Sequence, residues 1–305
     1  MNSRQIRLPV NFNSVIKPER LEKIRLQVSQ NKKQRNLSAF TAGLYDTGNQ
    51  MSIMQTLHVY TPMVEDPYIF GQIAAASSLG ETYACGGTPL TALNIVGFPA
   101  KQVDRDIMVK MLQGGINKLK EAGVVLIGGH SMQDPQVKCG YVINVMVDQK
   151  NVKKHAHARR GDVLIITKPV GAMFVLAKLT NRDTAQKSDE ALKEVINSMC
   201  ALNNKASAII NTLDAHICQH VSEPGLKKSL DTIARKAGGR IEIWHDQIPL
   251  FGNQQQYRKD ILEIISGPEI SGGLLFATAP QKAEKTLQIL HNKGLNKSSI
   301  IGKIN

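Results

Sequence analysis

The chain contains 305 residues, of which 42% are hydrophobic and 21% are charged. This length is sufficient for two domains of ordinary size, and the composition excludes extensive disorder. No apolar run reaches the roughly 20 residues that a membrane-spanning helix needs. The first residues lack the apolar stretch of a signal peptide. We therefore expect a soluble, cytoplasmic protein with no membrane partner.

The net charge of +13 raises the question of nucleic-acid binding, because Lys and Arg release counterions from phosphate backbones. The positive residues are dispersed in short pairs such as Lys32-Lys33 and Arg159-Arg160, without an aromatic stacking surface or a zinc-knuckle spacing. Specific nucleic-acid recognition is therefore not expected. The four cysteines form no CxxC pair, which predicts reduced, packed thiols.

Hydrophobic periodicity predicts alternating strands and helices after a polar lead-in. The expected elements of the first half are a helix over 17–30, a strand over 44–49, a strand over 51–59, a helix over 67–79, a strand over 90–98, a helix over 104–122 and strands over 124–127 and 141–147. Gly128-Gly129-His130-Ser131 directly follows a short apolar strand, so we expect a turn there. The small residues of Ala74–Ser78 predict close helix packing.

Composition turns polar and basic around residues 155–162, which predicts the connection between two domains. The expected elements beyond it are a strand over 163–167, a long helix over 189–213, a strand over 241–244, a turn into a strand over 271–277 and a helix over 282–293. The sequence therefore predicts an α/β protein with an amino-terminal domain over 1–155 and a carboxyl-terminal domain over 156–305.

Five segments of the chain are similar in amino-acid sequence, and in their order along the chain, to segments of one enzyme family. They are Pro62–Tyr68, Tyr83–Asn94, Gly128–Ser131, Thr167–Gly171 and Ile270–Leu275. This series resembles selenophosphate synthetase, or selenide, water dikinase, from about residue 15 to the carboxyl terminus. The resemblance implies an AIR-synthase-like (PurM-like) fold with mixed sheets flanked by helices, and a homodimer formed through the sheets of the amino-terminal domains.

The family converts ATP, selenide and water into selenophosphate, AMP and phosphate. Its chemistry needs several aspartates, because Mg²⁺ must neutralise the triphosphate and prefers carboxylate oxygens. It also needs a Cys or selenocysteine followed by a Lys near the amino terminus. The resemblance thus implies ATP and Mg²⁺ as cofactors.

Most of these acidic positions are changed in this chain. The family's aspartates align with Phe40-Thr41, His58, Glu81, His220 and Gly267. The segment over 7–17 contains no Cys, and the Gly-rich connection expected between Phe251 and Ile264 is shortened. Removing a single electrostatic stabiliser can cost on the order of 10²–10³ in rate, so we expect weak or no dikinase activity.

Two sets of residues are candidates for binding. The resemblance implies that Gly128, Gly129, His130 and Ser131 contact a nucleotide phosphate, although the same segment could be purely structural. It also implies that His58, Glu81 and His220 point into one cleft, where two imidazoles and a carboxylate would suit Zn²⁺ or Fe²⁺. The alternative for these three is drift after loss of the original metal.

Four other residues are given structural roles. His155 and His157 are expected to be linker residues, Cys85 a packed thiol, and Asp134 a loop carboxylate that caps local backbone. Three functions stay open. The first is a degenerate family member that pairs with itself or with an active paralogue. The second is an active enzyme in which Glu81 and Asp134 or Asp46 hold Mg²⁺. The third is a non-catalytic anion or nucleic-acid binder.

Overall fold

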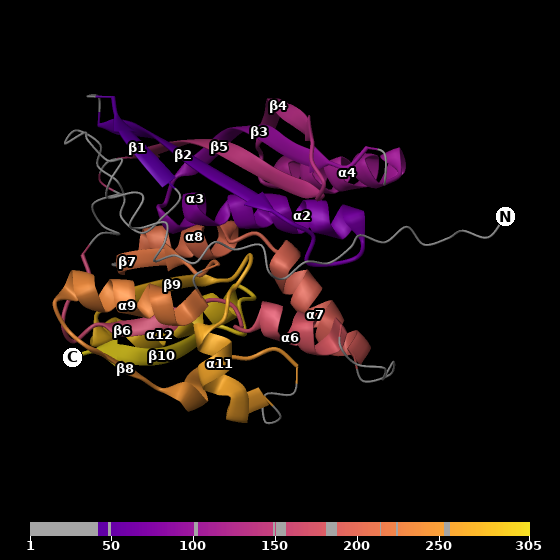
Figure 1. Cartoon of the computed structure of the whole chain (residues 1–305). Coiled ribbons are helices and arrows are strands. Elements are labelled where there is room, and N and C mark those ends of the chain that lie inside the picture. The colour runs from indigo at the N-terminus through magenta and orange to yellow at the C-terminus, as the bar shows by residue number, and fades with distance from the viewer. Residues whose placement is uncertain are drawn as a thin grey trace.

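The computed structural model describes residues 42–47, 50–100, 103–148, 150, 157–180, 188–213, 215–223, 225–252 and 257–305. The expected helix over 17–30, the pair Phe40-Thr41 and His155 lie outside these residues. The described residues form two α/β units, each built on a five-stranded sheet (Figure 1). None of the helices described here is long and apolar enough to cross a membrane.

The amino-terminal sheet has the strand order β1-β2-β5-β3-β4. Its strands are β1 Ala42–Asp46, β2 Met51–Tyr60, β3 Thr88–Phe98, β4 Val125–Gln133 and β5 Lys138–Asp148. The β3–β4 pair is parallel, whereas the β1–β2, β2–β5 and β3–β5 pairs are antiparallel, so this sheet is mixed.

Three helices cover the inner face of this sheet: α2 Pro67–Ser78, α3 Gly80–Ala84 and α4 Arg105–Glu121. Asp66 caps the first by accepting a hydrogen bond from the Ile69 backbone N–H at 3.0 Å, and Pro67 fits the first helical position. Asp104 caps α4 in the same way. As expected, the side chains of Ala74–Ser78 are all buried.

The carboxyl-terminal sheet has the order β7-β9-β6-β10-β8, and its paired strands are antiparallel. Its strands are β6 Val163–Ile166, β7 Ala215–His220, β8 Ile241–Ile243, β9 Leu274–Thr278 and β10 Ser299–Ile304. Its helices are α6 Ala172–Thr180, α7 Ser188–Cys200, α8 Asn204–Thr212, α9 Gly225–Ala237, α11 Ile261–Ser266 and α12 Pro280–Asn292, with short 3₁₀ turns η1 His245–Gln247 and η2 Arg258–Asp260. The helices α2 and α3 of the first unit pack against α7, α8 and β7 of the second.

Two predicted elements are wrong. Gly128–Ser131 is not a turn, because it lies in the middle of β4. A Cβ atom on Gly129 would collide with the Asn94 backbone oxygen of β3, so glycine permits close strand pairing here. The long helix over 189–213 is two helices, α7 and α8, separated at residues 201–203.

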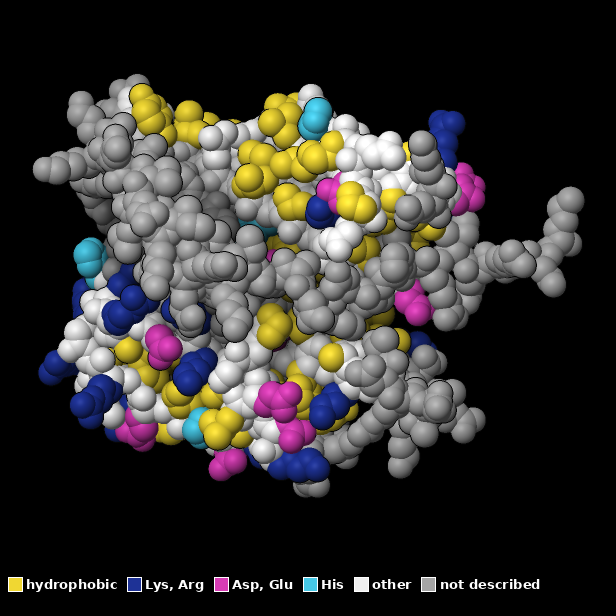
Figure 2. Space-filling view, viewed as in Figure 1, with side chains coloured by type: hydrophobic (Ala, Val, Ile, Leu, Met, Phe, Trp, Pro, Cys, Tyr) yellow, Lys and Arg dark blue, Asp and Glu magenta, His cyan; other side chains and the backbone are white. Residues whose placement is uncertain are grey.

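The outer face of the amino-terminal sheet carries apolar side chains, because alternate residues of each strand point away from the helices. In Figure 2 they form a group of yellow side chains over this sheet. The exposed large side chains on these strands are Tyr45, Ile53, Leu57, Val59, Leu90, Leu93, Val125, Ile127, Met132 and Met146. None of the helices described here covers these side chains, which together are called the apolar face below.

The helices α2 and α4 pack backbone to backbone. A Cβ atom on Gly71 would collide with the Met111 backbone oxygen, and one on Gly114 with the Tyr68 backbone oxygen. These glycines allow an approach that any larger residue would prevent. The close approach fixes the helix layer between the amino-terminal sheet and the carboxyl-terminal unit.

We expect Gly114→Val to lower the free energy of unfolding by about 3 kcal/mol or more, because the side chain has backbone rather than flexible atoms against it. Gly43→Val in β1 is the control, since a Cβ atom there meets no atom within 4 Å. Thermal and urea denaturation of both variants measure the effect. Equal stability of the two variants would contradict this account of the helix packing.

Candidate functional site

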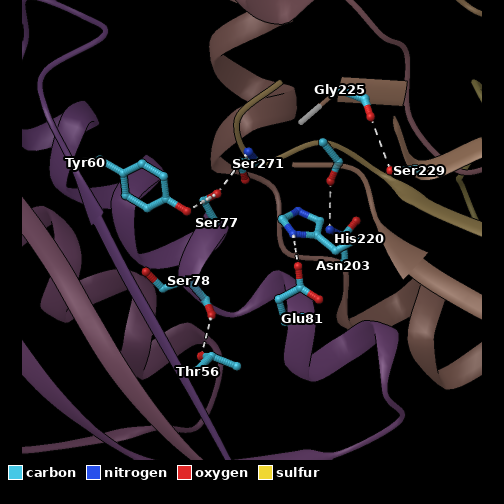
Figure 3. Close-up of polar contacts among 11 residues, drawn as sticks. Thr56, Tyr60, Ser77, Ser78, Glu81, Asn203, His220, Gly225, Ser229 and Ser271 are labelled. Atoms are coloured by element: carbon cyan, nitrogen blue, oxygen red, sulfur yellow. Dashed lines mark hydrogen bonds and ion pairs between the residues drawn. The ribbon is translucent and has the colours of Figure 1, made fainter. Parts of the chain in front are cut away.

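Polar side chains from both units meet where α2 and α3 face β7 and the turn before β9 (Figure 3). Tyr60 ends β2, Ser77 lies in the last turn of α2 and Glu81 in α3. His220 ends β7, and Ser271 precedes β9. All five residues are at least nine-tenths buried. This site, called the interdomain cleft below, therefore joins the two units through hydrogen-bonding groups removed from water.

A short hydrogen-bond chain crosses the interdomain cleft. The Tyr60 hydroxyl donates to Ser77 Oγ at 2.8 Å, and the Ser271 backbone N–H donates to the same oxygen at 3.1 Å. Burial raises the pKa of Tyr60 well above its usual range, so the phenol stays protonated and can donate. Ser77 thus ties the first unit to the turn of the second.

Ser271 itself is held in an uncommon conformation, with φ of 55° in the left-handed region. Its carbonyl accepts a hydrogen bond from Lys168 Nζ at 3.2 Å, while its own Oγ is buried and has no hydrogen-bond partner. A non-glycine residue in this region persists only where its surroundings fix it, and such residues gather at ligand sites. The Ser271 hydroxyl is therefore held in place but forms no hydrogen bond with any of the described residues.

Glu81 and His220 form the second contact across the cleft. His220 Nδ1 lies 3.9 Å from Glu81 Oε1, and the imidazole packs directly on the Cα of Gly80. Glu81 Oε2 and both nitrogens of His220 are buried and form no hydrogen bond with the part of the chain that the structure describes. Burial raises the pKa of Glu81 to about 8 and lowers the pKa of His220 to about 3. At neutral pH both groups are therefore uncharged, which removes the electrostatic part of the contact.

His58 lies near this pair on β2, with its ring stacked on Tyr60 at 6.0 Å between centroids. Burial lowers the pKa of His58 to about 4, so this imidazole is also neutral at pH 7. Within the described part of the chain, no group of three or more His, Cys, Asp or Glu side chains is placed to hold a metal ion. Metal binding by His58, Glu81 and His220 stays a prediction.

Lys168 organises the backbone behind the cleft. Its Nζ donates to the carbonyls of Ser198 at 2.9 Å and Ala201 at 2.7 Å, in addition to that of Ser271. These two carbonyls belong to the end of α7, where helical carbonyls lack partners and a cation is favoured. Burial lowers the pKa of Lys168 to about 7. The ammonium thus ends α7 and positions the turn at Ser271, which explains why the predicted long helix is interrupted.

Glu269 lies beside this lysine and fixes the next turn. Its two carboxylate oxygens accept hydrogen bonds from the backbone N–H groups of Gly171 at 2.7 Å and Ala172 at 3.1 Å. Burial raises the pKa of Glu269 to about 7, although these bonds oppose the shift. The motifs around Thr167–Gly171 and Ile270–Leu275 are therefore connected by buried ionisable groups with satisfied hydrogen bonds.

Comparisons with known proteins agree with this architecture. The family described as AIR synthase related protein, N-terminal domain, matches residues 39–147, and its C-terminal domain matches residues 159–305. The chain is 31% identical over 290 residues to a selenide, water dikinase of Pelobacter propionicus, covering 86% of this chain and 82% of that protein. It is 32% identical to the enzyme of the same name from Clostridioides difficile, covering 95% of this chain and 91% of that protein.

The chain belongs to the selenide, water dikinase family. Solved structures with a similar fold have lower identity. AaThiL complexed with AMPPCP and TMP gives a TM-score of 0.72 at 15% identity, covering 97% of this chain and 94% of that chain. Hydrogenase Maturation Protein HypE in complex with ATP gives a TM-score of 0.64 at 15% identity, covering 96% of this chain and 87% of that chain. These likenesses confirm the predicted two-domain AIR-synthase-like fold.

The family implies Mg²⁺ with ATP, and the donor groups of this chain do not fit Mg²⁺. Mg²⁺ requires near-octahedral oxygen ligands, most often ionised carboxylates. The aligned positions within the described residues hold two imidazoles, one glutamate whose pKa burial raises to about 8, and Gly267. Two further oxygen ligands were considered, Asp46 on β1 and Asp134. Asp134 accepts hydrogen bonds from Lys138 Nζ at 2.6 Å and from the Gln136 N–H at 2.9 Å. It caps its own loop, as predicted.

The remaining predicted residues are placed as follows. Gly128–Ser131 lies on the edge strand β4, with His130 and Ser131 exposed, whereas Glu81 lies below the inner face of the same sheet. The nucleotide contact expected for this segment stays a prediction. Cys85 is a free, half-buried thiol whose pKa is raised to about 12 by burial, which agrees with a packed rather than a nucleophilic residue. His157 is exposed.

Several residues of the cleft were not found by sequence reasoning. Tyr60, Ser77 and Lys168 lie in or beside recognised motifs, but their hydrogen bonds join segments separated by up to 194 residues. A lysine inside the apolar-flanked Thr-Lys-Pro-Val-Gly segment was a usable signal, because a buried lysine needs fixed acceptors. The conformation of Ser271 had no such signal, since glycine would be expected at a positive φ.

Proposed function

We propose that this chain is a selenide, water dikinase-like protein without metal-dependent phosphoryl transfer, which acts as a non-catalytic subunit. The contact between Glu81 and His220 supports the proposal most directly. In the family these two positions hold aspartates that bind metal and nucleotide. Here they hold a buried pair in which His220 packs on Gly80 and fills the space against α3.

Amino-acid replacements at the other positions that align with the family's functional residues support the same conclusion. His58 replaces a further aspartate, Gly267 offers no side chain, and the segment over 7–17 has no cysteine nucleophile. One missing carboxylate can be compensated by water or by substrate oxygen. Several missing carboxylates leave the negative charge of a triphosphate uncompensated, and phosphoryl transfer depends almost entirely on this compensation.

We propose that a nucleotide still contacts Gly128–Ser131 but is not converted. This segment has the same residues as in the family, and fold relatives such as AaThiL and HypE are known with AMPPCP and ATP. Backbone N–H groups can hold phosphate oxygens without a metal ion. A nucleotide held in this way would stabilise the protein rather than react.

The apolar face of the amino-terminal sheet supports assembly. Contiguous exposed apolar surface on a soluble protein marks an interaction site, and this face contains ten large side chains on five strands. Sheet-on-sheet packing buries such a face at about 10 Å spacing. We propose that a second copy of this chain, or an active member of the same family, covers this face.

Turnover tests the first half of the proposal. We expect no AMP above the uncatalysed level when the purified chain is incubated with ATP, Mg²⁺ and selenide, because His58, His220 and Gly267 stand where the family has aspartates. Phosphorus NMR detects AMP and selenophosphate together, with an active selenide, water dikinase as the positive control. AMP and selenophosphate formed in equal amounts by this chain would contradict the proposal.

Light scattering after size-exclusion chromatography tests the second half. The wild-type chain of 33.5 kDa should elute at twice its mass, and Ile53→Asp with Leu57→Asp should elute as a monomer, because buried carboxylates would oppose sheet packing. The matched control is Val109→Asp with Leu262→Asp, two exposed positions on α4 and α11. A monomeric wild type that also fails to pair with an active family member would overturn the assembly.

A further inference from the structure

Positive side chains gather along the outward side of α9 and beside its carboxyl-terminal end. In Figure 2, dark-blue side chains are concentrated at the end of the carboxyl-terminal unit where Figure 1 places α9. The residues, called the basic face below, are Arg159, Arg160, Lys227, Lys228, Arg235, Lys236 and Arg240. All are exposed except Lys228, which is half-buried.

These residues lie in two groups. At about 100° per residue, Lys227, Lys228 and Arg235 lie within roughly 100° of one another around α9, whereas Lys236 lies opposite Lys227. The Arg160 guanidinium donates to the carbonyl of Gly238, directly after the helix, and Arg240 follows two residues later. From Lys227 to Arg235 the helix rises roughly 12 Å, at about 1.5 Å per residue.

The charges of the basic face are only partly offset by the protein. Elsewhere on the described surface, Lys138 pairs with Asp134 at 2.6 Å and Lys303 pairs with Glu242 at 3.2 Å. None of the seven residues of the basic face forms an ion pair within the described residues, and their side-chain hydrogen bonds go to neutral acceptors. Asp231, the one acidic residue of α9, lies four residues from both Lys227 and Arg235 and offsets part of their charge. Mobile counterions must balance the remainder, and a polyanion can release them.

We propose that the basic face binds the phosphate backbone of a nucleic acid without reading its sequence. Four of the seven residues are arginines, whose planar guanidinium groups form paired hydrogen bonds with phosphate oxygens. No aromatic residue occurs in α9, so base stacking contributes nothing to this surface.

A membrane surface fits the basic face less well. Helices that bind at a lipid interface combine basic residues with exposed Trp, Phe or Leu. No large hydrophobic residue of α9 is exposed, because its apolar side packs against the sheet. The binding surface is thus electrostatic alone, and its strength should depend steeply on salt concentration.

Fluorescence anisotropy with a labelled uridine RNA of about 20 nucleotides, measured between about 50 and 200 mM salt, tests the proposal. The variant Arg235→Glu, Lys236→Glu, Arg240→Glu should lose at least about tenfold in affinity, and its salt dependence should fall by about two to three logarithmic units per logarithmic unit of salt. The matched control Lys205→Glu, Lys285→Glu, Lys293→Glu removes the same charge from exposed positions on α8 and beside α12. It should change affinity less than about twofold if binding is local.

Equal losses in the two triple variants would overturn the proposal, because they would mean that only the total charge matters. Tighter binding of poly-glutamate or of vesicles containing phosphatidylglycerol than of RNA would also overturn it. The glutamine triple variant at the same three positions guards against local unfolding. It should lose affinity in the same direction with an unchanged melting temperature, and wild-type affinity in this variant would contradict the assignment.

Discussion

The three hydrogen bonds of Lys168 Nζ hold the architecture of the carboxyl-terminal unit together. Taking an ammonium group out of water costs several kcal/mol, so it stays buried only where strong acceptors surround it. Carbonyls at the end of a helix are such acceptors, and a hydrogen bond to a charged group contributes about 1.5–3 kcal/mol. Because one of the three carbonyls belongs to Ser271, the same ammonium ends α7 and fixes the turn that faces the amino-terminal unit.

This position of Ser271 determines how the two units meet. Its N–H reaches Ser77 of α2, and Ser77 in turn accepts from Tyr60 of β2. Beside these hydrogen bonds, Glu81 and His220 lie at positions that align with the family's aspartates, and both side chains are buried and uncharged at neutral pH. The hydrogen bonds that orient the cleft are in place. We propose that the protein is a framework that acts through its surfaces.

The sequence predicted the fold well where local patterns determine it. Alternation in residues 51–59 and helical spacing in residues 67–79 and 104–122 located β2, α2 and α4 nearly at their observed bounds. The two wrong elements depend on distant contacts. Gly128–Ser131 continues as a strand because β3 pairs with it, and the break after α7 follows from a lysine 30 residues earlier in the chain. Propensity alone carries no information about such partners.

The sequence predicted which of the family's acidic residues the site lacks, but not which contacts its side chains make. Comparison of residue types at aligned positions located His58, Glu81 and His220, since charge and size can be compared without coordinates. The packing of His220 on Gly80 and the left-handed conformation of Ser271 could not be foreseen, because both depend on how the two units approach each other. The apolar face and the basic face were likewise not predictable, because each consists of residues from several elements that only the folded structure brings together.

The central claim is that the interdomain cleft no longer holds a divalent cation with a nucleotide. Electron paramagnetic resonance of Mn²⁺, titrated into the wild-type chain with a non-hydrolysable ATP analogue, tests it directly, because bound and free Mn²⁺ give different signals. The account predicts that free Mn²⁺ equals that of the analogue alone at every protein concentration. A protein-bound Mn²⁺ signal that saturates at one ion per chain, and disappears in Glu81→Gln, would contradict it.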